Sequence, residues 1–180
     1  MKVVCLIDCQ NDFISGVLGT KEAEVARDNI CNWLQKNVTC EDKVIITQDT
    51  HSKVDYFETQ EGKNLPVFHC EANSNGWMID SKIANTINVI QPWLGSVIKD
   101  TFGSMEVANR MPAPGNKVDS IYLLGFCTDI CVISNAMILK AAYPEIPIYV
   151  IDNCCAGTTP EKHQAALSVM ESCQIKVIKE

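Results

Sequence analysis

Four reactive side chains follow short apolar runs of this 180-residue chain. They are Asp8 at the end of run 3–8, Asp49 at the end of run 43–49, Lys99 in run 96–100, and Cys131 after run 120–125. A thiolate is a strong nucleophile, and it needs a base that removes the thiol proton and a cation that stabilises the charge. Together the four residues indicate nucleophilic catalysis. Cys131 alone could also be a packing residue, a metal ligand or half of a disulfide.

Cys131 falls in the first turn of the helix that we expect after run 120–125. Free N–H groups and positive partial charge at a helix N-terminus make a thiol easier to ionise, and a nearby lysine adds to this effect. Gly125 permits a sharp strand-to-helix turn, whose exposed N–H groups can hold an oxyanion. We therefore favour Cys131 as a nucleophile over a buried packing cysteine. For Cys127, inside the turn, we expect the backbone to matter more than the sulfur.

A second candidate site combines Asp49 with His51 and His69. Two imidazoles and a carboxylate are a common catalytic metal set that leaves positions open for water or substrate. The two histidines lie in the irregular stretch 50–78, and long loops of this kind are often functional. The alternative is that they are ordinary hydrogen-bonded loop histidines. The third histidine, His163, lies at an expected helix start, where we favour a structural role.

Alternating strand and helix patterns indicate how these residues are positioned. Apolar, β-branched runs occur at 3–8, 43–49, 96–100, 120–125, 148–152 and 175–178, and helical spacing occurs at 20–37, 79–90, 129–142 and 158–173. Strands that are apolar on both faces and alternate with helices predict a parallel sheet covered by helices. Ligands of such a sheet bind beyond the carboxyl ends of the strands, where the reactive residues are expected to gather.

Composition excludes several classes of protein. The net charge is −7 with scattered Lys and Arg, which argues against nucleic-acid binding. No apolar run approaches the roughly 18 residues of a membrane span, and the N-terminus lacks the features of a signal peptide.

The ten cysteines include no CxxC pair, and we expect most to be small buried residues in a reducing cytoplasm. The absence of a linker or repeat predicts one domain over 1–180.

Three motifs resemble those of a known family. The segments are "LIDCQNDF" (6–13), "VIKDTFGS" (97–104) and "GFCTDICV" (125–132). In this order they resemble the isochorismatase-like cysteine hydrolases, and most of all the nicotinamidase branch. The resemblance implies a doubly wound, mainly parallel six-stranded α/β sheet with helices on both faces, and a homo-oligomer. It also implies Asp8 as acid–base residue, Lys99 as catalytic lysine, Cys131 as nucleophile, and a cis Phe126–Cys127 bond that aims the N–H groups of Cys127 and Cys131 at one point.

The resemblance extends to a cofactor and a ring pocket. It implies a divalent metal at Asp49, His51 and His69, with Zn²⁺ expected and Mn²⁺ or Fe²⁺ as alternatives. Many relatives have a further histidine ligand, whereas this chain reads "VDYF" at 54–57, where Asp55 is a candidate ligand. Phe13 matches a residue that lines the ring pocket. Relatives have a tryptophan before the second metal histidine; here Phe68 or Trp77 is the candidate replacement.

These features predict hydrolysis of a small planar primary amide through a thioester, with nicotinamide converted to nicotinate and ammonia as the leading case. Two alternatives remain open. One is a hydrolase of the same superfamily that acts on another small amide, a carbamoyl compound or a ureide. The other is a non-catalytic metal-binding or partner-binding module. Ammonia release from a panel of amides distinguishes the three.

Overall fold

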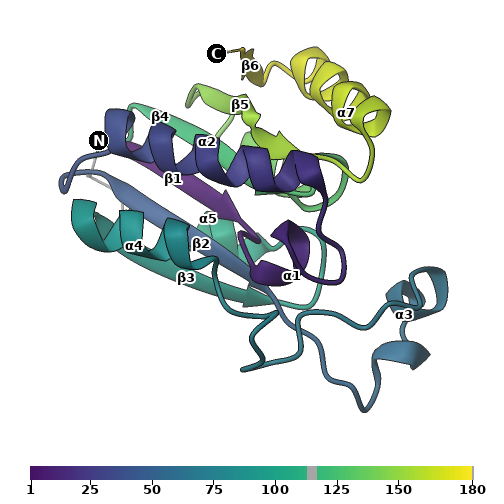
Figure 1. Ribbon diagram of the computed structural model, residues 1–180. Helices are drawn as coiled ribbons and strands as arrows, with labels where there is room; N and C mark the ends of the chain where they lie inside the picture. The colour runs from purple at the N-terminus through teal and green to yellow at the C-terminus, as the bar shows by residue number, and fades with distance from the viewer. Residues whose placement is uncertain (113–116, 180) are drawn as a thin grey trace.

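The computed structural model describes residues 1–112 and 117–179 of the chain. Its centre is a six-stranded sheet of order β3-β2-β1-β4-β5-β6, in which all neighbouring strands are parallel (Figure 1). The strands are β1 (Lys2–Ile7), β2 (Lys43–Asp49), β3 (Trp93–Lys99), β4 (Ser120–Phe126), β5 (Ile148–Ala156) and β6 (Lys176–Ile178). The predicted α/β fold with a mainly parallel six-stranded sheet is confirmed.

Helices cover both faces of this sheet. The helices of the described residues are α1 (Asn11–Ile14), α2 (Lys21–Asn37), α3 (Gln60–Asn64), α4 (Ser81–Ile90), α5 (Met105–Asn109), α6 (Ile133–Ala142) and α7 (Pro160–Ser172), of which all but α3 pack on the sheet. Two single turns add to them: the 3₁₀ turn η1 (Tyr56–Glu58) and the π-helical turn η2 (Thr128–Val132), which leads into α6. Buried residues of α1, α2 and α4 pack on one face, and those of α5, α6 and α7 pack on the other.

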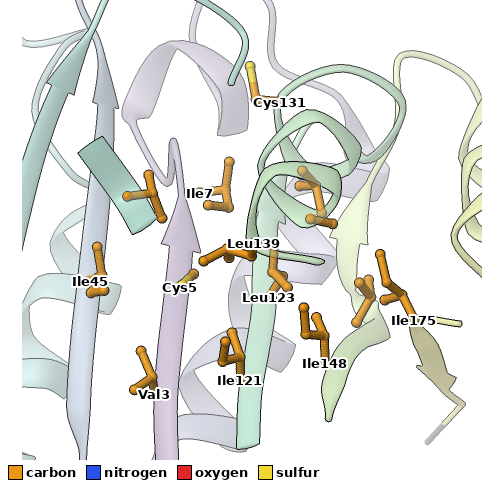
Figure 2. Close-up of a cluster of buried hydrophobic side chains, with 14 of the residues drawn as sticks. Val3, Cys5, Ile7, Ile45, Ile121, Leu123, Cys131, Leu139, Ile148 and Ile175 are labelled. Atoms are coloured by element: carbon orange, nitrogen blue, oxygen red, sulfur yellow. The ribbon is translucent and has the colours of Figure 1, made fainter. Parts of the chain in front are cut away.

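The alternation of side chains along β1 shows how the two cores form. Cys5 and Ile7 point to the face of α6, where Leu139 packs (Figure 2). Leu6 belongs to the cluster on the opposite face, with the buried residues of α2. All three β1 side chains are fully buried, which is why the strand reads as a continuous apolar run. Burial of each large aliphatic side chain stabilises the fold by roughly 1.5–3 kcal/mol.

Most element boundaries lie within a few residues of the prediction. The helix expected at 20–37 is α2, where Thr20 caps the N-terminus by accepting a hydrogen bond from Ala23 N. The strand expected at 96–100 begins earlier, at Trp93, which pairs with Lys43 of β2. Trp93 is 74% exposed because β3 is an edge strand, so the apolar pattern of a buried strand does not extend over its first residues.

The direction of winding reverses between β1 and β4. From β1 the chain winds outward through β2 to β3, and then returns to place β4 on the other side of β1. At such a switch point the loops at the carboxyl ends of the strands separate and leave a crevice for ligands. The segment that contains η1 and α3 extends past the carboxyl ends of β2 and β3 and borders this region (Figure 1).

Two further observations concern membranes and cysteines. Within the described residues, no helix is long and apolar enough to cross a membrane. All ten cysteines fall in the described ranges and carry free thiols. Six of them are buried, in keeping with the expectation that most serve as small packing residues.

Candidate active site and metal cluster

Asp8, Lys99 and Cys131 meet at the carboxyl ends of the strands, and we call these three residues the triad. Lys99 Nζ lies 2.7 Å from Asp8 Oδ2 and 3.6 Å from Cys131 Sγ. Asp8 follows β1, Lys99 ends β3, and Cys131 lies in η2 after β4. Figure 2 shows Cys131 above the upper end of the strands. The structure therefore brings together the three residues that the motifs singled out.

Hydrogen bonds hold the Asp8 carboxylate in place. Thr47 Oγ1 donates to Asp8 Oδ1 at 2.6 Å and accepts from the Asp8 N–H at 3.0 Å. The backbone of Asp8 has a φ of 47°, a left-handed value that is uncommon outside glycine and that turns the chain sharply out of β1. Lys99 forms a second ion contact, 3.6 Å from Asp49 Oδ1. The ammonium is thus shared by two carboxylates and one thiol.

Burial and neighbouring charges together shift the pKa values of the triad. It raises the pKa of Cys131 well above the usual thiol value; Asp8 adds to this shift and Lys99 opposes it. Burial also raises the pKa of Asp8, against the opposing effect of Lys99. The Lys99 pKa is raised, because the nearby negative charges outweigh the burial that disfavours an ammonium. The Cys131 thiol is therefore protonated at rest and lies beside the permanently charged Lys99 ammonium. The position at a helix N-terminus had instead suggested a thiol that ionises easily.

The turn that holds Cys131 depends on close backbone packing. Gly125 has a φ of 129°, and a Cβ there would lie 2.0 Å from the Ile7 carbonyl oxygen, so this position requires glycine. The Phe126–Cys127 peptide bond is cis, at the place that the resemblance implied. Asn135 then ties the turn to the loop after β3: its Nδ2 donates to the Cys131 carbonyl at 2.8 Å, and its Oδ1 accepts from Ser104 N at 3.0 Å.

A second group of side chains lies next to the triad, and we call it the metal cluster. It comprises Asp49, His51, Glu61 and His69, and one candidate ligand atom from each lies within 4.8 Å of all the others. Asp49 Oδ2 is 3.0 Å from His51 Nε2 and 3.3 Å from His69 Nε2. Glu61 Oε1 is 3.6 Å from both of these nitrogens. Two imidazoles and two carboxylates converging on one point form a donor set that suits zinc.

The surroundings orient these ligands. His69 Nδ1 lies 2.9 Å from the Val67 carbonyl oxygen, which can only accept, so Nδ1 carries a proton and Nε2 faces the carboxylates of Asp49 and Glu61. Burial disfavours a charged His51, but hydrogen bonds to Asp49 and Glu61 outweigh this effect and raise the His51 pKa to about 9. Burial likewise disfavours ionised Asp49, but the two histidines lower its pKa. The carboxylates thus attract positive charge to this point.

Glu61 is the member of the metal cluster that the sequence did not indicate. The candidate that it suggested, Asp55, is not part of the cluster in the described chain; it precedes η1 and is exposed. Glu61 lies on α3, which folds back over His51 and His69. A second unforeseen residue is Gln10, whose buried side-chain amide pairs with the backbone N–H and carbonyl of Asp49 at 2.7 and 2.8 Å.

A cleft of about 940 Å³ opens onto both groups. Its lining includes Cys131, Cys127, His69 and Phe13, so Phe13 lies in the same cleft as the nucleophile candidate. Phe13 also packs edge-on against His69, with ring centroids 5.5 Å apart.

The described lining of the cleft does not include Phe68 or Trp77, the other two aromatic residues expected in the ring pocket. Phe68 instead packs against Tyr56, with ring centroids 5.4 Å apart. Trp77 Nε1 donates to Thr50 Oγ1 at 2.7 Å. Both rings therefore support the segment around the metal cluster rather than the wall of the cleft.

Comparison with known proteins agrees with this geometry. The Isochorismatase domain model matches residues 2–180. A nicotinamidase from Schizosaccharomyces pombe is 24% identical over 204 residues, which span 97% of this chain and 91% of that protein. The nicotinamidase structure from Bacillus subtilis has a TM-score of 0.79 at 22% identity and covers 98% of both chains. The pyrazinamidase of Pyrococcus horikoshii in complex with zinc has a TM-score of 0.70 at 19% identity, with 99% of both chains covered. The resemblance to the nicotinamidase branch is confirmed, and this chain belongs to the isochorismatase family.

Proposed function

We propose that this protein is a cysteine-dependent amidohydrolase that converts a small planar primary amide, with nicotinamide as the leading candidate, into its acid and ammonia. Family membership and the nicotinamidase relatives place the chain among hydrolases of amide C–N bonds. One observation carries the cysteine mechanism: Lys99 Nζ contacts both Asp8 Oδ2 and Cys131 Sγ, and Cys131 lines the cleft. A base, a cation and a nucleophile are thereby in reach of one bound carbonyl group.

The first half of the reaction forms a thioester. Asp8, whose raised pKa makes it a better base than an exposed aspartate, takes the proton of Cys131. Lys99 stabilises the resulting thiolate, which attacks the amide carbon. The backbone N–H groups of Cys127 and Cys131 are the proposed donors to the oxyanion. The C–N bond then breaks as Asp8 returns the proton to the nitrogen, and ammonia leaves.

The second half returns the enzyme to its starting state. A water molecule gives its proton to Asp8 and attacks the thioester carbon, which forms the C–O bond of the acid. The C–S bond breaks, and the Cys131 thiolate recovers a proton from Asp8. Lys99 keeps its charge throughout, because its raised pKa prevents it from acting as a proton donor. Its role in both halves is to stabilise and orient the two groups beside it.

Asp49, His51, Glu61 and His69 are the proposed ligands of a divalent metal ion. The fit rests on the donor set itself, four oxygen and imidazole ligands whose donor atoms lie within 4.8 Å of one another, with His69 Nε2 facing the carboxylates of Asp49 and Glu61. A bound ion would supply a Lewis acid for a ring nitrogen of the substrate or for a water molecule. The zinc in the Pyrococcus horikoshii pyrazinamidase supports zinc as the first choice.

The cleft favours a flat aromatic amide. Phe13, Phe126 and Ile130 contribute apolar walls near Cys131, and such walls stabilise a planar ring by burial and stacking. A ring nitrogen on the side of His69 would face the metal cluster while the carboxamide faces Cys131. Nicotinamide and pyrazinamide have this arrangement of groups, whereas benzamide lacks the nitrogen.

Ammonia release from a panel of amides tests the proposal. The panel contains nicotinamide, pyrazinamide, benzamide, an aliphatic amide and a carbamoyl compound, each assayed with the metal-loaded protein. Aromatic ring amides are expected to exceed the aliphatic amide by at least ~10-fold in kcat/KM, because losing ring contacts costs about 1–3 kcal/mol. Nicotinamide is expected to exceed benzamide. A preference for the carbamoyl compound would assign the protein to another branch of the family, and no ammonia from any substrate would contradict the amidohydrolase assignment.

A further inference from the structure

A chain of hydrogen-bonded side chains reaches the nucleophile turn from α7. Asp152 Oδ1 lies 2.8 Å from His163 Nε2, and His163 Nδ1 lies 2.7 Å from Thr128 Oγ1. Thr128 is fully buried and is the first residue of η2, whereas the His163 and Asp152 side chains remain 12% and 20% exposed. The chain therefore runs from near the surface to the turn that holds Cys131.

The direction of these hydrogen bonds follows from the chemistry of Asp152. An ionised carboxylate can only accept, so His163 Nε2 must carry a proton. In the neutral ring Nδ1 then accepts, and the Thr128 hydroxyl donates to it. A threonine hydroxyl that donates to this partner has no proton left to donate to a backbone carbonyl of the turn. The bond thus holds the first residue of η2 in a single arrangement.

The next residue of the turn is tied to the same part of the molecule. Asp129 Oδ1 accepts from Thr158 N at 2.8 Å, and Asp129 Oδ2 accepts from Thr158 Oγ1 at 2.7 Å. Gly157 allows this approach, because a Cβ there would lie 2.8 Å from Asp129 Oδ1 and 2.9 Å from His163 Cβ. Two consecutive residues at the start of η2 are therefore held by the segment that begins α7.

We propose that His163 is a positioning residue that, through Thr128, fixes the backbone of η2 and so aims the N–H groups of Cys127 and Cys131 at the reacting carbonyl. The inference rests on the proposed function for the identity of the reaction. His163 is absent from the described lining of the cleft that holds Cys131; it lies on an adjoining pocket of about 370 Å³. It therefore acts through Thr128 rather than by touching the substrate.

Variants of Thr128 and His163 test this link. Thr128→Val keeps the shape of the side chain and removes the hydroxyl, and Thr128→Ser restores the hydroxyl. We expect Thr128→Val and His163→Ala each to lower kcat at least ~10-fold on the best amide while KM changes less than ~2-fold. Thr128→Ser should stay within ~3-fold of wild type, and the double variant should lose no more than the worse single variant, because both remove the same link. Additive losses, or unchanged kcat in both single variants, would overturn the inference.

A readout that needs no substrate separates this inference from the proposed function. Iodoacetamide alkylation of Cys131, followed by peptide mass spectrometry, should be at least ~5-fold slower in Thr128→Val and His163→Ala, since thiol reactivity depends on the groups that stabilise the thiolate. Thr128→Ser and Gln164→Ala, an exposed neighbour on α7, should match wild type. His163→Ala, at a partly exposed position, carries the test if Thr128→Val unfolds. Unchanged or faster alkylation in His163→Ala overturns the inference even if no amide proves to be a substrate.

Discussion

The triad and the metal cluster lie side by side but are built differently. The triad comes from the ends of strands: in the β2–β3 pairing Asp49 is opposite Lys99, and in the β1–β4 pairing Ile7, just before Asp8, is opposite Gly125. The metal cluster takes one residue from a strand end and three from the segment 51–69, whose helical pieces are short. The sheet register therefore sets the positions of the triad, whereas the metal cluster depends on how one loop folds.

The two groups also differ in charge, and Asp49 joins them. Within the triad one ammonium balances one carboxylate, and both side chains are at most 1% exposed. The metal cluster has two carboxylates and two imidazoles, so its balance depends on protonated histidines or on a metal ion. Asp49 Oδ1 faces Lys99, and Asp49 Oδ2 faces His51 and His69. This difference supports the proposed division of roles, in which the triad carries out the bond-breaking steps and the metal cluster holds an ion beside them.

The largest effect is expected from the triad. Cys131→Ala should lower ammonia release by at least ~1,000-fold, because the nucleophile is lost while the fold is kept. Cys127→Ala should stay within ~3-fold of wild type, since only the backbone of Cys127 is proposed to take part. Steady-state assays together with thermal unfolding of each variant make this comparison. Substantial activity in Cys131→Ala would contradict the cysteine mechanism.

A next, smaller effect is expected from the histidines of the metal cluster. His51→Ala should abolish stoichiometric metal in protein purified without a chelator, because one of the four proposed ligands is removed. The triad should survive this change, since its members are held by the sheet and by Thr47, and Cys131 should still be alkylated in the folded variant. Elemental analysis gives the metal content. A metal-free wild-type protein with full activity would remove the metal from the mechanism.

Glu61 and Asp55 provide a matched pair within the same loop. Glu61→Gln should weaken metal binding by at least ~10–100-fold, because losing a proposed ligand should cost no less than losing a residue that only orients one. Asp55→Asn should leave it unchanged within ~2-fold, because Asp55 is exposed and outside the described cluster. Titration against a competing chelator measures both affinities. Equal weakening in the two variants would show that the loop's charge, rather than the position of Glu61, governs binding.

The smallest effect concerns the ring pocket, for which two phenylalanines provide the comparison. Phe13→Leu should raise KM for an aromatic amide by ~3–10-fold, since an aromatic contact is worth about 0.5–1.5 kcal/mol beyond burial. Phe68→Leu should change KM by less than ~2-fold, because Phe68 packs against Tyr56 and Phe57 outside the described lining of the cleft. Initial-rate measurements over a range of substrate concentrations test both. A larger change in KM with Phe68→Leu than with Phe13→Leu would indicate that the substrate ring binds near Phe68 rather than near Phe13.

The sequence alone predicted the fold and the meeting of the triad. Residues that directly follow parallel strands are constrained to one edge of the sheet, so Asp8, Lys99 and Cys131 could be brought together from their positions after apolar runs. His51 and His69 were also foreseeable, because His51 lies two residues after β2 and histidines are rare in this chain. Sequence patterns were therefore sufficient to place a residue wherever the end of a strand fixes its position.

The fourth member of the metal cluster, the pKa of Cys131 and the contact between His163 and Thr128 could be seen only in the tertiary structure. Glu61 lies in "QEGKN", which reads as an exposed helix until α3 is seen to fold over His51 and His69. The helix-terminus argument predicted an easily ionised Cys131, whereas burial raises its pKa, and burial depends on what packs above the turn. His163 reaches Thr128 across 35 residues of sequence. Contacts of this kind arise from packing between distant elements, and no spacing within one element encodes them.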